Sequence, residues 1–324
     1  MKKVGAWHHV LLIFTLFAFS SGSRSQQDYP NRPVKVVVPF PPGGAPDLVG
    51  RTLAQRLQER LGQPFVVENR TGAGGNIAAE AVAHAAPDGY TLFAPSDGPL
   101  VINPHVYDKV NFDTLRDFEP ISLVASVGLV LMACPNVPVS SVADVIALAK
   151  KRKLSYATSG FGSSQHMVGE MLKASGDIEL THVPYKGFAQ AVIDAVACNV
   201  DLVFGAISTG IPHIRSGKLK AIAVTIAKRH PGLPDTPTFR EAGHPGVAIE
   251  AYMGLLAPAG TPRPIIDKLH DEVVAILKEK DTIQRLTGAG LDLVGNSPAE
   301  FGARLKLDLA RFGKIARSLD ARVQ

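Results

Sequence analysis

Three loops rich in glycine and small polar residues are the segments of this sequence most clearly suited to binding a ligand. They span residues 39–47 (PFPPGGAPD), 69–76 (NRTGAGGN) and 158–166 (TSGFGSSQH). Glycine lets backbone N–H groups approach a bound molecule closely. The start of a helix adds unpaired N–H groups and about half a positive charge. If each loop opens a helix, the pattern predicts an anion site made from backbone, with no arginine required.

The polar side chains of these loops allow two interpretations. Asp47 would lie in the first turn of a helix, where a carboxylate complements the helix dipole; alternatively, it accepts a hydrogen bond from a ligand ammonium or hydroxyl group. The nearby hydroxyl groups either donate to a ligand or satisfy local backbone groups. They belong to Ser96, Thr158, Ser159, Ser163 and Ser164.

Patterns typical of nucleotide binding, metal binding and catalysis are missing. There is no GxGxxG after the first predicted strand, no GxxxxGK[ST], no HExxH and no GxSxG. Ser163 and Ser164 are near His166 in sequence, but that spacing is not the geometry of a catalytic triad. We therefore expect His166 to orient its loop, and we expect no enzyme activity, metal or cofactor.

The start of the chain resembles a secretory signal. Lys2 and Lys3 precede an apolar run, Val10–Phe19, that is too short to span a bilayer. Small residues at Ser23 and Ser25 predict cleavage after Ser25, so residues 1–25 are interpreted as a signal peptide. The mature protein is then expected to be soluble and outside the cytoplasm. Whether Cys134 and Cys198 pair in such an oxidising compartment stays open.

Composition bounds the remaining possibilities. The chain has 324 residues, of which 46% are hydrophobic and 19% charged, enough for two domains or lobes with sizeable cores. Without the predicted signal, 31 basic residues face 29 acidic ones. This balance disfavours a nucleic-acid surface.

Short β-branched runs alternate with amphipathic runs along the mature chain. Val34–Val38 is a predicted strand, and Val49, Leu53, Leu57 and Leu61 mark one face of a helix that Gly62 ends. Further strands are expected near residues 64–68, 90–94, 121–133, 154–157, 182–183, 201–204, 221–225 and 254–257; further helices near 77–86 and 142–150 and after a capping box at 297–300. This alternation predicts an α/β protein with mostly parallel sheets. The three loops would then lie beyond the carboxyl ends of strands, where such sheets bind ligands.

The order of motifs strongly resembles the Bug family, the extracytoplasmic solute-binding receptors of tripartite tricarboxylate transporters, also called the TctC family. The matching segments are YPNRPVKVVVPFPPGGAPD, LGQPFVVENRTGAGGN, APDGYTL, INP, LSYATSGFGSSQH, THVPYKG, VDLVF, LKAIAVT, LPDTPTFREAG and GLLAPAGTP. The resemblance implies a type II periplasmic-binding-protein fold, with two α/β lobes of mixed, mostly parallel sheets joined by two crossover strands. Lobe one would comprise residues 28–125 plus 249–324, and lobe two residues 126–248.

The resemblance also implies a function and a site. The function would be capture of a small carboxylate between the lobes and delivery to membrane permease subunits; the alternative is a sensor that presents the ligand to a membrane signalling protein. A monomer is expected. The ligand-binding residues implied are Phe40, Pro42, Gly43, Gly44, Ala45, Asp47, Gly75, Asn76, Ser96, Ser159, Gly162, Ser163, His166, Gly187, Phe188 and Gly205.

One departure from the family bears on specificity. Where many relatives carry Asp-Asn after VDLVF, this chain has Gly205-Ala206. An acidic contact for a ligand amino group is then missing, which favours a ligand whose far end is apolar or neutral, or one longer than aspartate.

Overall fold

The computed structural model describes residues 29–319, so the predicted signal peptide lies outside the described residues. Ten strands form one sheet in the order β2-β1-β3-β9-β4-β7-β5-β6, with β8 and β10 both paired to β4. The strands are β1 (Val34–Val38), β2 (Phe65–Asn69), β3 (Thr91–Phe93), β4 (Phe118–Ala133), β5 (Leu154–Thr158), β6 (Leu180–Pro184), β7 (Leu202–Ala206), β8 (Lys220–Val224), β9 (Glu250–Pro258) and β10 (Asp292–Leu293).

Helices cover this sheet and connect its parallel strands. The α-helices are α1 (Ala45–Leu61), α2 (Asn76–Ala83), α3 (Asn103–Val106), α4 (Val142–Ala149), α5 (Ser164–Gly176), α6 (Phe188–Val196), α7 (Ile207–Arg215), α8 (Arg263–Ile276), α9 (Lys280–Gly288) and α10 (Pro298–Leu319). Two short turns, η1 (Ala73–Gly75, 3₁₀) and η2 (Gly98–Ile102, π), precede α2 and α3. Among residues 29–319, no helix is long and apolar enough to cross a membrane.

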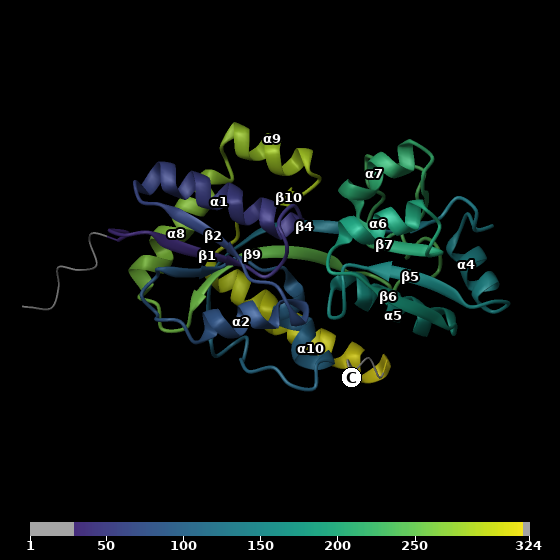
Figure 1. Ribbon diagram of the computed structural model, residues 1–324, viewed down its shortest axis with the longest axis horizontal. Helices are drawn as coiled ribbons and strands as arrows, with labels where there is room; N and C mark the ends of the chain where they lie inside the picture. The colour runs from purple at the N-terminus through teal and green to yellow at the C-terminus, as the bar shows by residue number, and fades with distance from the viewer. Residues whose placement is uncertain (1–28, 320–324) are drawn as a thin grey trace, which may run out of the picture.

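Two groups of strands lie at opposite ends of the sheet (Figure 1). We call β1–β3 with α1 and α2 the first half, and β5–β8 with α4–α7 the second half. Within each half, the first strand lies between the next two and pairs with both in parallel: β1 with β2 and β3, and β5 with β6 and β7. Every antiparallel pair involves β4 or β9. The predicted α/β fold with mixed sheets is confirmed. The pairing is not mostly parallel as expected, because β4 and β9 contribute five antiparallel pairs beside the four parallel ones among the described strands.

Strands β4 and β9 connect the two halves. β4 pairs with β9 from Phe118 to Gly128, and from Leu129 onward it pairs with β7 and β8 instead. One continuous strand therefore runs from the first half into the second, and β9 runs back beside it (Figure 1). This is the arrangement expected of crossover strands; the lobe boundaries at residues 125/126 and 248/249 stay a prediction.

Local sequence signals explain where the main helices begin and end. In α1, Val49, Leu53 and Leu57 are buried, and Gly62 ends the helix in the left-handed conformation with φ 71°. At the start of α10, the Ser297 hydroxyl accepts from the Glu300 N–H, and the Glu300 carboxylate accepts from the Ser297 N–H. This is the capping box that the sequence predicts.

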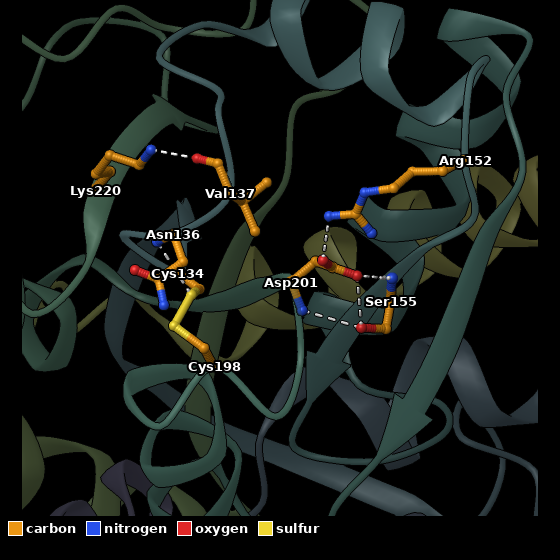
Figure 2. The surroundings of a disulfide bond; sticks show 8 residues. All are labelled: Cys134, Asn136, Val137, Arg152, Ser155, Cys198, Asp201 and Lys220. Carbon is orange, nitrogen blue, oxygen red and sulfur yellow. Dashed lines mark hydrogen bonds and ion pairs between the residues drawn. A yellow bond between two sulfur atoms is a disulfide. The ribbon is translucent and has the colours of Figure 1, made fainter.

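A disulfide within the second half resolves the question left open about the cysteines. Cys134, at the end of β4, bonds to Cys198, just after α6 (Figure 2). Beside it, Asp201 accepts hydrogen bonds from Arg152 at 2.7 Å and from the Ser155 N–H at 2.8 Å. The bond closes a loop across 64 residues of sequence and joins the end of β4 to the end of α6.

Candidate functional site

The carboxyl ends of the parallel strands bring the predicted loops together. β1, β2 and β3 deliver residues 39–44, η1 and residues 94–98 to one edge, while β5, β6 and β7 deliver residues 159–163, 185–187 and the start of α7 to another. The two edges touch. A Cβ atom added to Gly98 would lie 2.7 Å from the Gly162 carbonyl oxygen, and one on Gly74 would lie 3.0 Å from that of Phe161.

The first loop, residues 39–44, leaves its backbone open. Residues 41–44 are exposed, and Gly43 has a φ of 93°. Nothing lies within 4 Å of a Cβ built on Gly43, and Pro46 is 3.8 Å from one built on Gly44. Helix α1 begins at Ala45 directly after this exposed backbone. Apart from Pro46, which has no N–H, the first residues of the helix have N–H groups without a partner in the helix, and these are available to an anion.

Asp47 lies beneath this loop and holds its shape. Its carboxylate is 4% exposed and accepts from the Gly43 N–H at 3.0 Å, Arg51 Nε at 2.9 Å and Asn69 Nδ2 at 2.8 Å. Burial acts to raise its pKa, but these hydrogen bonds outweigh burial and the pKa is lowered. Asn69 also donates to the Phe40 carbonyl oxygen. These contacts match the local, structural interpretation of Asp47; direct ligand binding by its side chain stays a prediction.

The second glycine-rich loop packs tightly where the first is open. Gly75 has a φ of 99°, and a Cβ there would lie 3.0 Å from Pro39 and 3.1 Å from Pro99. Asn76 accepts from Asn103 Nδ2 at 2.6 Å, and Asn103 also donates to the Gly74 carbonyl oxygen. Gly75 and Asn76 are thus engaged in local packing, and ligand binding by them stays a prediction. Sequence reasoning missed the role of Asn103, whose signal was its place in the INP motif.

The facing loop, residues 159–163, engages its hydroxyl groups locally. The Ser163 hydroxyl accepts from the His166 N–H at 3.2 Å as the cap of α5 and donates to the Gly160 carbonyl oxygen at 2.7 Å. Ser159 donates to Gln165 at 3.0 Å. A side chain on Gly162 would overlap Asn103. What this loop offers a ligand is chiefly backbone.

His166 is a buried member of an aromatic stack. Its ring stacks on His182 with centroids 4.3 Å apart, and Phe161 meets both rings edge-on. Burial lowers the pKa of His166 to about 4 and, with His166 adding to the effect, that of His182 to about 3, so both rings are neutral near pH 7. Within residues 29–319, His166 Nδ1 has no hydrogen-bond partner. The sequence singled out neither Phe161 nor His182 for the site, although Phe161 is in a glycine-rich loop.

The remaining predicted residues line the same edges. Gly187 precedes α6, and the ring of Phe188 lies where a side chain on Gly205 would be, so the Phe188 ring packs directly on the β7 backbone. Ser96 is half-buried and forms a bridge with Met253 of β9.

The cationic side chains Arg70 and Lys186 near these edges are not placed as buried ion-pair partners for a ligand carboxylate. Arg70 pairs with Glu68 at 2.9 Å, and Lys186 is exposed. In the part of the chain that the structure describes, no group of three or more His, Cys, Asp or Glu side chains could hold a metal ion. Backbone and helix N-termini are therefore the main features of the site.

The chain matches the family model described as "Tripartite tricarboxylate transporter family receptor" over residues 49–320. Among curated proteins, it is 33% identical to Protein BugT of Bordetella pertussis over 318 residues, 97% of this chain and 98% of that protein. Both the sequence and its extent thus agree with the resemblance seen in the motifs.

Two solved structures match nearly the whole chain. One is R. palustris Rpa4515 with adipate, at a TM-score of 0.84 and 37% identity, covering 90% of this chain and 98% of that one. The other is MatC (Rpa3494) from Rhodopseudomonas palustris with bound malate, at a TM-score of 0.83 and 34% identity, covering 89% and 99%.

Proposed function

Because the chain belongs to the tripartite tricarboxylate transporter receptor family, we propose that it is a periplasmic receptor that captures a small carboxylate between two lobes and delivers it to the transporter's permease. The observation that carries this proposal is the meeting of two glycine-rich edges, with α1 and α5 beginning at them. The likeness to structures with bound adipate and malate supports a carboxylate as the ligand class.

In this proposal, the carboxylate lies against the backbone of residues 43–45 and the start of α1. N–H groups and the helix dipole stabilise the anion, each charge-assisted bond contributing about 1.5–3 kcal/mol. The facing loop and the Gly187 backbone close over it from the second half. Phe188, packed on Gly205, forms an apolar surface at the other end, which favours a ligand whose far end is apolar or neutral.

The crossover strands β4 and β9 supply the connection between the proposed lobes, residues 28–125 plus 249–324 and residues 126–248. Ligand binding would shift the population toward the state in which the two edges meet. Reversible capture needs no nucleophile and no metal, and the neutral, buried His166 is poorly suited to proton transfer at neutral pH.

A thermal-shift screen over mono-, di- and tricarboxylates tests the ligand class. A ligand at 100 times its dissociation constant should stabilise the folded state by about 2.7 kcal/mol, a shift of several degrees in Tm. Calorimetric titration of each hit gives its affinity. The receptor proposal fails if no carboxylate raises Tm, or if the purified protein converts the compound that binds.

Delivery to a permease needs its own test. Deleting the gene should abolish uptake of the identified solute, and the wild-type gene should restore uptake. A Gly44→Val copy, correctly folded and exported, should not restore it. Uptake that is unaffected by the deletion would favour the sensor alternative.

A further inference from the structure

A buried carboxylate joins the two halves at the edge of the proposed site. Asp97, immediately before η2, is 2% exposed, and Ser164, the first residue of α5, is 3% exposed. The Ser164 hydroxyl donates to Asp97 Oδ2 at 2.6 Å. The two residues fall on opposite sides of the proposed lobe boundary. Any opening of the lobes that separates η2 from α5 would break this bond and expose both groups to water.

The charged and titratable groups facing Asp97 come from two further elements. On α10, Arg304 pairs with the buried carboxylate of Asp308 at 2.6 Å. On β9, the fully buried Tyr252 ring lies 5.1 Å from the Arg304 guanidinium. Asp97 and Asp308 both raise the pKa of Tyr252, after burial, so its hydroxyl stays neutral. One guanidinium therefore faces two carboxyl groups, and the buried cluster carries excess negative charge whenever both are ionised.

We propose that Asp97 and Ser164 form a latch that stabilises the lobe-closed state, and that closure is most favourable when the buried Asp97 is protonated. This rests on the proposed receptor function. Carboxylate capture would then be favoured in acidic surroundings and weakened as the pH rises. The effect is a regulatory property of the site and adds no contact to the ligand.

The direction of the pH dependence of closure follows from the environment of Asp97. Burial first of all, and then the neighbouring Asp308, raise its pKa from 3.8 to about 7; the hydrogen bond from Ser164, the Gly98 N–H and Arg304 act in the lowering direction. In an open state, the hydrated carboxyl would titrate near its ordinary value of about 3.9. The closed state thus binds the proton more tightly, and protonation favours closure. The contribution of Asp97 to closure is complete below about pH 4. As the pH rises, the equilibrium constant for closure falls by at most about tenfold per pH unit, and above about pH 7 the contribution is gone.

The first experiment measures closure without any ligand. Cysteine-linked spin labels at Gln55 on α1 and Gln190 on α6, both exposed, report the distance between the halves. In the wild type, the population with the short distance should fall between about pH 4 and about pH 7. In Asp97→Asn, which cannot ionise but keeps an acceptor for Ser164, it should stay constant. Identical pH profiles for the two proteins, or none in either, would overturn the latch.

Two further experiments test the hydrogen bond and the effect on ligand binding separately. Ser164→Ala removes the bond but leaves Asp97 buried, so closure should weaken at every pH while its pH dependence remains. Calorimetric titration with adipate and malate at the same pH values measures the effect on ligand binding. As the pH rises, the affinity of the wild type for the acid should fall at least tenfold more than the affinity of Asp97→Asn. If neither acid nor any other carboxylate binds, the receptor function fails while the distance measurement still decides the latch.

Discussion

The first loop and the facing loop have similar compositions but use glycine in opposite ways. In the first loop, Gly43 and Gly44 have almost no neighbours, and the exposed backbone is supported from below by Asp47. In the facing loop, a Cβ atom added to Gly160 would lie 2.9 Å from the Tyr185 carbonyl oxygen, and one added to Gly162 would overlap Asn103. The glycines of the first loop keep its backbone accessible, whereas the glycines of the facing loop allow close packing, through which two edges of the sheet touch.

This difference shows that a glycine-rich loop after a strand is not in itself a binding loop. The sequence predicts the two loops equally, since both follow strands and open helices. Only packing shows which one leaves the backbone of its glycines open. We therefore expect substitutions in the first loop to alter ligand affinity, and substitutions in the second half to alter stability or closure.

The largest expected effect is on binding, from Gly44→Val. Gly44 has a φ of −84° and a ψ of 170°, which any residue adopts, and a Cβ there makes only an ordinary contact at 3.8 Å. The fold should therefore tolerate valine, while its branched side chain blocks the approach to the α1 N-terminus. Calorimetry with the native solute should detect no binding. Gly246→Val, at another position with free space, is the control and should bind normally.

The second half should depend on its disulfide for stability. Replacing Cys134 and Cys198 with alanine releases a loop of 64 residues, which the chain-entropy model values at about 4 kcal/mol. We expect the free energy of unfolding to fall by about 2–5 kcal/mol. Hydrogen exchange should show the loss in β5–β7 and α6 before β1–β3. Uniform loss across both halves would mean that they unfold as a single unit.

Much of this architecture could be predicted from the sequence because it rests on local signals. The period of α1, the left-handed Gly62 and the Ser297–Glu300 box each act within a few residues. Contacts between distant segments carry no such signal. The stack of His166 on His182, the position of Asn103 between two loops and the Asp97–Ser164 bond all depend on how the halves meet.

A smaller effect is expected from Asp47→Asn, which acts on the first loop through its support. The amide keeps its size but loses the ion pair with Arg51 and part of the acceptor set for Gly43 and Asn69. Hydrogen bonds to a charged group contribute about 1.5–3 kcal/mol, so both stability and affinity should fall by up to that amount. Because the pKa of Asp47 is lowered, its contribution is present above about pH 4 and disappears as the pH falls.

The matched control for Asp47 is Asp267→Asn. Asp267 forms an i,i+4 pair with Arg263 at 2.8 Å, but both side chains are more than half exposed. Exposed pairs contribute at most about 1 kcal/mol. Equal losses for the two variants, measured by urea unfolding, would show that the buried network under the first loop has no special role.

The facing loop should respond to Ser163→Ala mainly in stability. Ser163 caps α5, and loss of such a cap costs about 1 kcal/mol. Since its hydroxyl is occupied by His166 N–H and the Gly160 carbonyl oxygen, affinity should change less than threefold after correction for stability. A tenfold loss of affinity with normal Tm would instead make this hydroxyl a direct ligand contact.

The smallest effects are expected from two cations near the site, Arg70 and Lys186. Arg70 is engaged by Glu68, and Lys186 is exposed, so neither is placed as a buried partner of an anion. If backbone N–H groups hold the carboxylate, Arg70→Ala and Lys186→Ala should each weaken binding only modestly. Removing one partner of a buried charge pair would cost about 3–5 kcal/mol, more than a hundredfold in affinity. The complementary test replaces the ligand's carboxylate by its amide, which helix dipoles and N–H donors should bind far more weakly. A hundredfold loss in either variant, with the amide still bound, would place the anchor on a side chain and remove the distinction between an open first loop and a packed facing loop.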